Sequence, residues 1–162
     1  MILIALGANL PSRAGPPDAT LAAALASLEK RQVEIRAVSP FYRTAAWPDP
    51  SDPPFVNAVA ELGTPLQPVA LLAILHELET DFGRKRSAPN APRTLDIDLL
   101  DYDGRIEPGP PVLPHPRLES RGFVLVPLCD IAPSWRHPVS GRTARELLAA
   151  LPDRGEVRKL AL

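Results

Sequence analysis

The stretch Ile2-Leu3-Ile4-Ala5-Leu6-Gly7 is a short, uninterrupted apolar run that ends at a glycine. This pattern is typical of a strand that is buried on both faces, since a half-exposed strand would alternate apolar and polar side chains. The run is shorter than the ~20 apolar residues that span a bilayer, and it lacks the basic start of a signal sequence. We therefore expect residues 2–6 to form a central strand.

The patterns that follow this strand predict the remaining elements. Leucines recur at helical spacing in residues 21–28 and again in residues 71–78, whereas apolar and polar residues alternate in residues 33–37 and 55–62. The expected elements are a helix from about Asp18, a strand from Val33 towards Arg43, a strand over 55–62, a helix from Pro68 to Gly83 and a strand over 94–102. Thr143 and Glu146 form a capping box that opens a short C-terminal helix.

This element order predicts the fold class. The order β-α-β-β-α-β indicates an α+β fold of the ferredoxin-like type, in which an antiparallel sheet carries its helices on one face, with a C-terminal extension added. We expect one domain over residues 1–162. Because unrelated functions share this fold, the function has to come from particular residues.

Composition excludes several classes of protein. Apolar residues make up 45% of the 162 residues and charged residues 23%, with a net charge of −1. A negative charge and 5% aromatic residues argue against a nucleic-acid-binding or membrane-surface protein. The single cysteine, Cys129, excludes an intrachain disulfide and fits a reducing compartment. We expect a cytoplasmic monomer that binds neither nucleic acid nor membrane.

The strongest chemical signal is the segment Pro92-Arg93-Thr94-Leu95-Asp96-Ile97-Asp98-Leu99-Leu100. Side chains on a strand alternate with a period of two, so Asp96 and Asp98 share one face and the apolar residues share the other. Two carboxylates fixed side by side repel each other unless a cation lies between them, which makes them suitable ligands for Mg²⁺. A solvated acidic edge strand is the alternative interpretation of an isolated Asp-x-Asp.

Positive charges lie close to this acidic pair. Arg84, Lys85, Arg86 and Arg93 all fall within sixteen residues of it, at the end of a helix and the start of a strand. Metal-binding carboxylates that face arginines can hold a polyphosphate, although a solvated charge cluster would have the same sequence. The sequence contains no G-x-x-x-x-G-K-[ST] or G-x-G-x-x-G motif, so a glycine-rich loop cannot hold the phosphates.

Two further segments contribute candidate residues. Phe55 and Asn57 lie on the less apolar face of the third strand, where they offer a stacking surface and an amide to a planar heterocycle. Core packing of Phe55 is the alternative. His115 lies between Pro114 and Pro116, which fix its direction, so a phosphate contact and a solvated surface position are both open.

The chain resembles the 6-hydroxymethyl-7,8-dihydropterin pyrophosphokinase family in six blocks that extend from near its first element to near its last. The blocks are residues 6–10 (Leu-Gly-Ala-Asn-Leu), 39–44 (Ser-Pro-Phe-Tyr-Arg-Thr), 55–58 (Phe-Val-Asn-Ala), 92–98 (Pro-Arg-Thr-Leu-Asp-Ile-Asp), 113–116 (Leu-Pro-His-Pro) and 121–128 (Arg-Gly-Phe-Val-Leu-Val-Pro-Leu). The resemblance implies the same ferredoxin-like core. The chain departs from the best-known members of the family at Asn90-Ala91, where they carry Trp-Gly, at Ser87 and at Pro110-Pro111-Val112.

The resemblance implies roles for particular residues. Asp96 and Asp98 resemble the paired ligands of two Mg²⁺ ions, and Arg84 and Arg93 resemble the catalytic arginines. The residues that match ATP-binding positions are Glu79, Arg84, Arg86, Leu99, His115 and Arg121. The residues that match the pterin pocket are Thr44, Ala45, Trp47, Phe55, Asn57 and Phe123.

The implied reaction is attack of the pterin hydroxymethyl oxygen on the β-phosphorus of ATP, with AMP as the leaving group. The implied partners are the small molecules ATP and 6-hydroxymethyl-7,8-dihydropterin, and the implied pathway is folate biosynthesis. We also expect residues 44–54 and 84–93 to act as mobile lids. One alternative is another Mg²⁺-dependent nucleotidyl- or glycosyltransferase that uses the Asp-x-Asp pair, and a second is a ferredoxin-like RNA-binding or sensing module.

Overall fold

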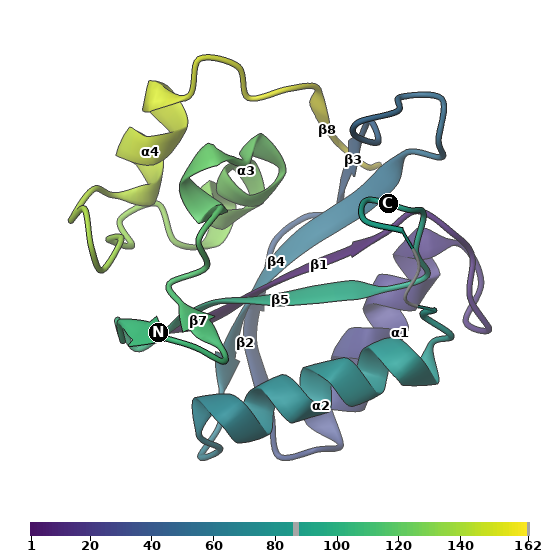
Figure 1. Ribbon diagram of the computed structural model, residues 1–162, viewed down its shortest axis with the longest axis horizontal. Helices are drawn as coiled ribbons and strands as arrows, with labels where there is room; N and C mark the ends of the chain where they lie inside the picture. The colour runs from purple at the N-terminus through teal and green to yellow at the C-terminus, as the bar shows by residue number, and fades with distance from the viewer. Residues whose placement is uncertain (86–87, 162) are drawn as a thin grey trace.

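The computed structural model describes residues 1–85 and 88–161 and consists of one main antiparallel sheet with helices on both of its faces (Figure 1). The helices are α1 (Pro17–Glu29), α2 (Pro68–Asp81), α3 (Gly122–Ile131) and α4 (Ala144–Ala150), with a 3₁₀ helix at Leu118–Ser120. The strands are β1 (Ile2–Ala8), β2 (Glu34–Val38), β3 (Tyr42–Thr44), β4 (Phe55–Gly63), β5 (Asp96–Tyr102), β6 (Glu107–Pro108), β7 (Val112–Leu113) and β8 (Val157–Lys159). Within the described residues, no helix is both long enough and apolar enough to cross a membrane.

Strand β1 is an interior strand of the sheet, paired on both sides, as the sequence predicts. It pairs antiparallel with β4 on one side and with β5 on the other. The hydrogen-bonded order is β5-β1-β4-β3-β8, and β2 pairs with the C-terminal half of β4. The predicted α+β class and antiparallel sheet are therefore confirmed, whereas the specific ferredoxin-like order and the single-domain organisation stay predictions.

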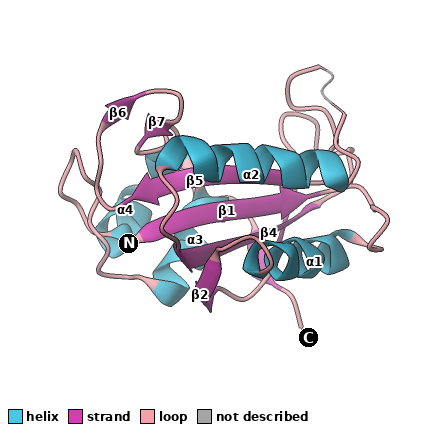
Figure 2. Cartoon of the chain, turned by 90° about the horizontal axis from the view of Figure 1, so that it is seen from below, coloured by secondary structure: helices cyan, strands magenta, loops and turns pink. Residues whose placement is uncertain are grey.

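The two helices of the predicted β-α-β-β-α-β core, α1 and α2, lie on one face as expected, and the C-terminal extension adds a second hydrophobic core on the other face. One core joins Ile4 and Leu6 of β1 to the leucines of α1 and α2. The other joins Leu3 of β1 to α3, α4 and Trp135. Figure 2 shows α1 and α2 on the near face of the sheet and α3 and α4 behind it. A central strand needs apolar partners on both faces, and the C-terminal extension supplies the second set.

The predicted strand from Val33 towards Arg43 is also corrected, since the structure divides it into β2 and β3. The division falls at Ser39 and Pro40. The Ser39 hydroxyl accepts the Val59 amide at 3.0 Å, and the Ser39 amide donates to the Val59 carbonyl at 2.9 Å. Because Pro40 has no amide hydrogen for the ladder, regular pairing stops there and resumes at Tyr42.

Helix α3 was not predicted, although it begins within the matched block of residues 121–128. Pro127 lies inside the helix, where it cannot donate the usual backbone hydrogen bond, so the sequence argues against a helix. The helix begins at Gly122, where a β-carbon would lie 1.9 Å from the Arg154 carbonyl oxygen. Burial of Val124, Leu125 and Leu128 against the sheet therefore outweighs the weak local preference.

Tyr42 of β3 links the sheet to α3, because its hydroxyl donates a hydrogen bond to the Asp130 carboxylate. Burial first, and then the hydrogen bond to Asp130, raise the pKa of Tyr42 to about 12, above its ordinary value near 10. The stability that this proton contributes is fully present below about pH 10. It is lost as the pH rises towards 12, because the unfolded chain releases the proton first.

We predict that Tyr42→Phe lowers the free energy of unfolding at pH 8 by roughly 1.5–3 kcal/mol, the usual size for a hydrogen bond to a charged group. Because wild-type protein loses this contribution at high pH, the difference between wild type and variant should shrink at pH 11. Urea unfolding of both proteins at the two pH values measures it. An equal difference at pH 8 and pH 11 would contradict the role assigned to the phenolic proton.

Candidate active site

The pairing of β1 with its two neighbours places the polar candidates in one row across the sheet. Gly7 lies opposite Asn57 on β4 and opposite Asp96 on β5. Ala5, two residues earlier, lies between Val59 and Asp98. Since alternate residues share a face, Asn57, Asp96 and Asp98 lie on the face that α3 covers further along the sheet. The prediction that Asp96 and Asp98 share a face is therefore confirmed by the strand register.

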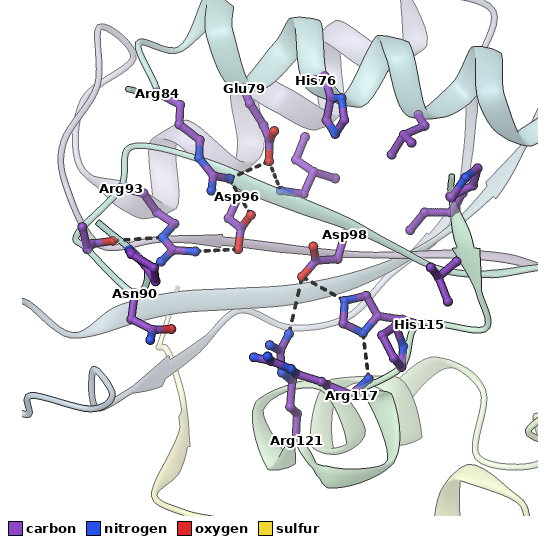
Figure 3. A pocket seen from close by; sticks show the side chains of 18 of the residues that line it. His76, Glu79, Arg84, Asn90, Arg93, Asp96, Asp98, His115, Arg117 and Arg121 are labelled. Atoms are coloured by element: carbon purple, nitrogen blue, oxygen red, sulfur yellow. Dashed lines mark hydrogen bonds and ion pairs between the residues drawn. The ribbon is translucent and has the colours of Figure 1, made fainter. Parts of the chain in front are cut away.

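A cavity of about 630 Å³ lies over the start of β5. Its walls come from α2, from the segment between α2 and β5, and from the segment that leads into α3 (Figure 3). The cavity brings together most of the residues expected to contact ATP and metal, namely Glu79, Arg84, Arg93, Asp96, Asp98, Leu99, His115 and Arg121. Arg86, a further predicted ATP contact, lies outside the described residues.

Asp96 is held by two arginines. Arg84 Nη1 lies 2.6 Å from Asp96 Oδ1, and Arg93 Nη1 lies 3.2 Å from Asp96 Oδ2. Burial alone would lower the pKa of Arg84, but the carboxylates of Asp96 and Glu79 outweigh burial and raise it. Arg84 therefore stays a cation at every accessible pH, and both oxygens of Asp96 face positive charge.

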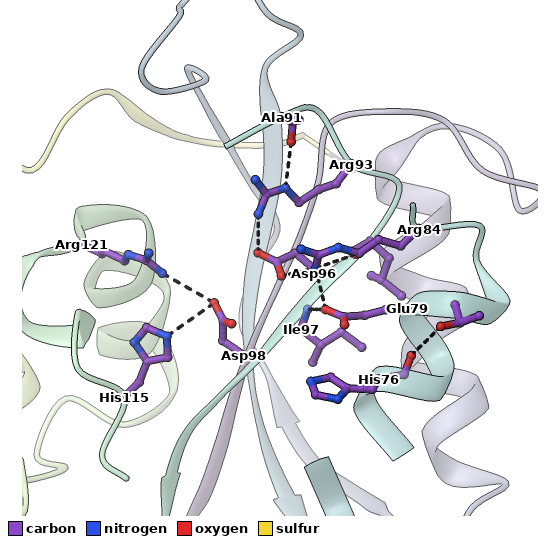
Figure 4. Close-up of polar contacts among 12 residues, drawn as sticks. His76, Glu79, Arg84, Ala91, Arg93, Asp96, Ile97, Asp98, His115 and Arg121 are labelled. Atoms are coloured by element: carbon purple, nitrogen blue, oxygen red, sulfur yellow. Dashed lines mark hydrogen bonds and ion pairs between the residues drawn. The ribbon is translucent and has the colours of Figure 1, made fainter. Parts of the chain in front are cut away.

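Asp98 is much less well compensated. Arg121 Nη1 and His115 Nε2 lie 3.6 and 3.9 Å from its Oδ2 (Figure 4). Burial first, and then the negative charge of Asp96, raise the pKa of Asp98 to about 6 although three arginines oppose the shift. The cavity thus holds one neutralised carboxylate and one whose charge is poorly balanced, so a cation would be favoured beside Asp98.

His115 contacts Asp98 as a neutral ring. Burial and the nearby Arg121 and Arg117 lower its pKa to about 4, so the 3.9 Å contact is no ion pair at neutral pH. The Arg117 amide donates to His115 Nδ1 at 3.1 Å, which leaves the ring proton on Nε2. His115 therefore presents a hydrogen-bond donor to the cavity. Arg117 also lines the cavity, and no motif in the sequence identified it.

Glu79 of α2 connects Arg84 to strand β5. Its Oε2 accepts from Arg84 Nη1 at 2.8 Å and from the Ile97 amide at 2.9 Å, and the residue is only 3% exposed. It was predicted as an ATP contact, and it does line the cavity, yet its described bonds hold Arg84 and β5 in place. A buried carboxylate that joins a helix to a strand fixes the position of the arginine between them.

Protein side chains can supply only part of the coordination sphere of a Mg²⁺ ion at this site. Within residues 1–85 and 88–161, no group of three or more His, Cys, Asp and Glu side chains could hold a metal ion. Asp96 and Asp98 provide two hard carboxylates, and octahedral Mg²⁺ commonly takes one or two of these together with water and phosphate oxygens. The donor set therefore fits a metal that arrives with a phosphorylated ligand.

The residues predicted to bind the pterin lie outside the lining of this cavity, along β3, the segment that follows it, β4 and the start of α3. Asn57, 6% exposed, donates from Nδ2 to Thr44 Oγ1 at 2.7 Å. Trp47 is 71% exposed, and Ala45, two residues earlier, is exposed too. The Phe55 ring lies 5.9 Å from the Arg93 guanidinium, and the Phe123 ring lies 5.4 Å from that of Arg121.

Comparison with known proteins then decides the family. The family model described as 7,8-dihydro-6-hydroxymethylpterin-pyrophosphokinase matches residues 3–133. A Pseudomonas aeruginosa protein named 2-amino-4-hydroxy-6-hydroxymethyldihydropteridine pyrophosphokinase is 40% identical over 156 residues, which cover 95% of this chain and 93% of the relative. A Synechocystis protein of the same name is 38% identical over 148 residues, which cover 90% of this chain and 73% of the relative.

The chain belongs to the 7,8-dihydro-6-hydroxymethylpterin-pyrophosphokinase family. The resemblance stated from the sequence is therefore confirmed. A solved structure of wild-type Plasmodium falciparum HPPK-DHPS superimposes with a TM-score of 0.70 at 16% identity. The match covers 91% of this chain and 40% of that one, and at such identity it supports the fold alone.

The unequal compensation of the two carboxylates predicts opposite effects on stability in this member of the pyrophosphokinase family. In buffer that contains a metal chelator at pH 8, Asp98→Asn should raise the free energy of unfolding by up to about 1 kcal/mol, because it removes a poorly balanced charge. Asp96→Asn should lower it by about 1–2 kcal/mol, because two arginines lose their partner. Denaturant unfolding of both variants measures this, and destabilisation by Asp98→Asn would show that its charge is well compensated.

Proposed function

We propose that this chain transfers the diphosphate group of ATP to the hydroxymethyl oxygen of 6-hydroxymethyl-7,8-dihydropterin, releasing AMP, as a step of folate biosynthesis. The supporting observation is the cavity on β5, where Arg84, Arg93 and Arg121 surround a pair of carboxylates in a chain of the pyrophosphokinase family. Arginines fixed in this way can bind a triphosphate without a glycine-rich loop. The cytoplasmic location and the monomeric state stay predictions.

Asp96 and Asp98 would hold two Mg²⁺ ions. Bound Mg²⁺ would neutralise phosphate oxygens and lower the pKa of a hydroxyl group that it contacts. The raised pKa of Asp98 supports this assignment, because a carboxylate that is costly to ionise alone gains most from a nearby cation. The remaining metal ligands would be phosphate oxygens and water.

The arginines would change partners when ATP binds. Arg84 and Arg93 now neutralise Asp96, and each of these contacts can be exchanged for one with a phosphate oxygen of similar charge. Arg121 would bind phosphate beside Asp98, and neutral His115 would donate a hydrogen bond from Nε2 to a phosphate oxygen. After this exchange of partners, arginines that already line the cavity would stabilise charge on the transferring group.

The pterin would bind beside this cavity, on the β4 side of the same sheet face. Asn57 lies in the row that contains Asp96, and its amide would bind the polar edge of the ring. Phe55 and Phe123 would stack on the ring once the guanidinium groups of Arg93 and Arg121 turn towards phosphate. Thr44, which bonds Asn57, and the adjoining Ala45 and Trp47 would complete this pocket.

Phosphorus NMR of the protein with ATP, Mg²⁺ and 6-hydroxymethyl-7,8-dihydropterin tests the proposed function. AMP and a pterin diphosphate ester should appear together and in equal amounts. Asp96→Ala and Asp98→Ala should each retain less than about a tenth of the wild-type rate, which corresponds to an activation free energy raised by at least ~1.4 kcal/mol. Release of inorganic pyrophosphate or a nucleoside diphosphate instead would favour a nucleotidyl- or glycosyltransferase and overturn the proposal.

The row formed by Asn57, Gly7 and Asp96 yields a prediction about pterin binding. A β-carbon at Gly7 would lie 2.8 Å from Asn57 Oδ1, which is too close, so Gly7→Ala should displace this amide. We expect pterin to bind at least about tenfold more weakly, since a misplaced buried amide leaves polar groups of the ligand unpaired, while ATP affinity changes less than about threefold. Calorimetric titration of each ligand measures this.

Gly63→Ala is a matched control for this substitution. It also adds a β-carbon to a sheet glycine, but the atoms it would meet belong to the exposed side chain of Arg36, which can move. Gly63→Ala should bind both ligands as wild type does. If Gly7→Ala binds pterin normally, or loses ATP and pterin equally, Asn57 has been placed in the wrong pocket.

A further inference from the structure

Asn9 lies just past the end of β1 and is 3% exposed. The strands that flank β1 both begin beside this point, so the chain entering β4 and the chain entering β5 pass on either side of Asn9. No role on ATP, metal or pterin accounts for a buried polar side chain at this position. Its hydrogen-bond partners indicate what it does.

The Asn9 side chain joins these two entering segments. Its Oδ1 accepts the backbone amide of Arg93 at 2.8 Å, and its Nδ2 donates to the Pro53 carbonyl at 3.0 Å. The backbone amides of Asn9 and Leu10 both donate to the Arg93 carbonyl, at 3.0 and 3.2 Å. The Arg93 backbone is therefore held through both its amide and its carbonyl, and one planar side chain connects it to Pro53.

Arg93 is the residue whose side chain reaches both halves of the proposed site. Its Nη1 lies 3.2 Å from Asp96, and its guanidinium lies 5.9 Å from the centre of the Phe55 ring. Pro53 is two residues before Phe55, so the bond to its carbonyl fixes the chain from which that ring projects. Asn9 thus fixes the backbone of Arg93 relative to both the carboxylate and the ring.

We propose that Asn9 is a positioning residue that acts through Arg93, holding this arginine in register with the metal-binding carboxylate and the pterin-stacking ring. An amide side chain is required because it combines one donor and one acceptor in a single rigid plane. The proposal rests on the proposed function, which gives Arg93 its task. Misplacement of a catalytic group by about 1 Å can cost on the order of a hundredfold in rate, so a positioning residue has a measurable effect.

Two substitutions separate the two side-chain bonds, and a third serves as a control. Asn9→Asp keeps an acceptor for the Arg93 amide but loses the donor to Pro53, whereas Asn9→Ala loses both. Ser12→Ala removes a hydroxyl whose hydrogen bonds, among the residues that the structure describes, go to Thr20 and Ala14 in the same N-terminal part of the chain. Thermal unfolding of all three variants checks that they are folded.

Amide hydrogen exchange of the ligand-free variants, followed by NMR, tests the restraint itself. In Asn9→Ala, the Arg93 amide should exchange at least about tenfold faster than in wild type. In Asn9→Asp, that amide should stay within about threefold of wild type, while the amides of Asp49, Ser51 and Asp52 exchange faster. Ser12→Ala should change neither. Unchanged exchange of both segments in Asn9→Ala would overturn the proposal, and Asn9→Asp still tests it if Asn9→Ala does not fold.

A double-mutant cycle tests whether Asn9 acts through Arg93. Asn9→Ala should lower kcat at least about tenfold, with a smaller change in the KM for ATP, and Asn9→Asp should fall between it and wild type. In an Arg93→Ala background, the further loss on Asn9→Ala should be less than about threefold, because the group it positions is already absent. Equal losses in the two backgrounds, or wild-type kcat in Asn9→Ala, would overturn the proposal.

The two failures are distinguishable. A wild-type protein that makes neither AMP nor pterin diphosphate contradicts the proposed function, whereas the exchange measurement needs no activity and decides the restraint by Asn9 alone. A wild-type protein that is active while Asn9→Ala retains full kcat contradicts only the positioning role.

Discussion

The site depends on one constraint, which is that Asp96 and Asp98 cannot move apart. They lie on the same face of β5, and β5 is fixed by its antiparallel pairing with the buried central strand β1. Like charges at this spacing repel, and partial burial strengthens the repulsion. The surrounding cations compensate part of this negative charge, since Arg84 and Arg93 bond Asp96 and Arg121 lies near Asp98. Burial and the charge of Asp96 still raise the pKa of Asp98, so a further cation beside it would be favoured.

The same constraint explains the layout of the sheet around the site. The residue of β1 that lies between Asp96 and Asn57 is Gly7, so the row has room for polar groups on both neighbouring strands. Further along this face, β1 presents Leu3 to α3 and α4, which anchor the segment that carries His115 and Arg121. One strand thus orders the apolar core at one end of the face and the charged cavity at the other.

Much of this arrangement is encoded locally and could be predicted. The apolar run at residues 2–6 identified the central strand, and the period of two at Asp96 and Asp98 identified their common face. Features that depend on distant contacts could not be predicted. Helix α3 contains Pro127 and forms because the sheet buries it, and the break between β2 and β3 depends on bonds from Ser39 to Val59. Asn9 stood within a recognised motif, yet its bonds to Pro53 and Arg93 join residues more than forty positions apart. Assignment of the remaining site residues rests on the resemblance and stays a prediction.

The most direct test of this account is a count of bound divalent ions. Electron paramagnetic resonance of Mn²⁺, titrated into protein with a non-hydrolysable ATP analogue and corrected for the analogue alone, measures how many ions the complex holds. Because the two carboxylates supply only part of each coordination sphere, wild-type protein should bind two ions tightly with the analogue and bind Mn²⁺ weakly without it. Asp96→Asn and Asp98→Asn should each bind fewer. Equal numbers of bound ions in wild type and both variants would show that the carboxylate pair is not a metal site, and would contradict the account.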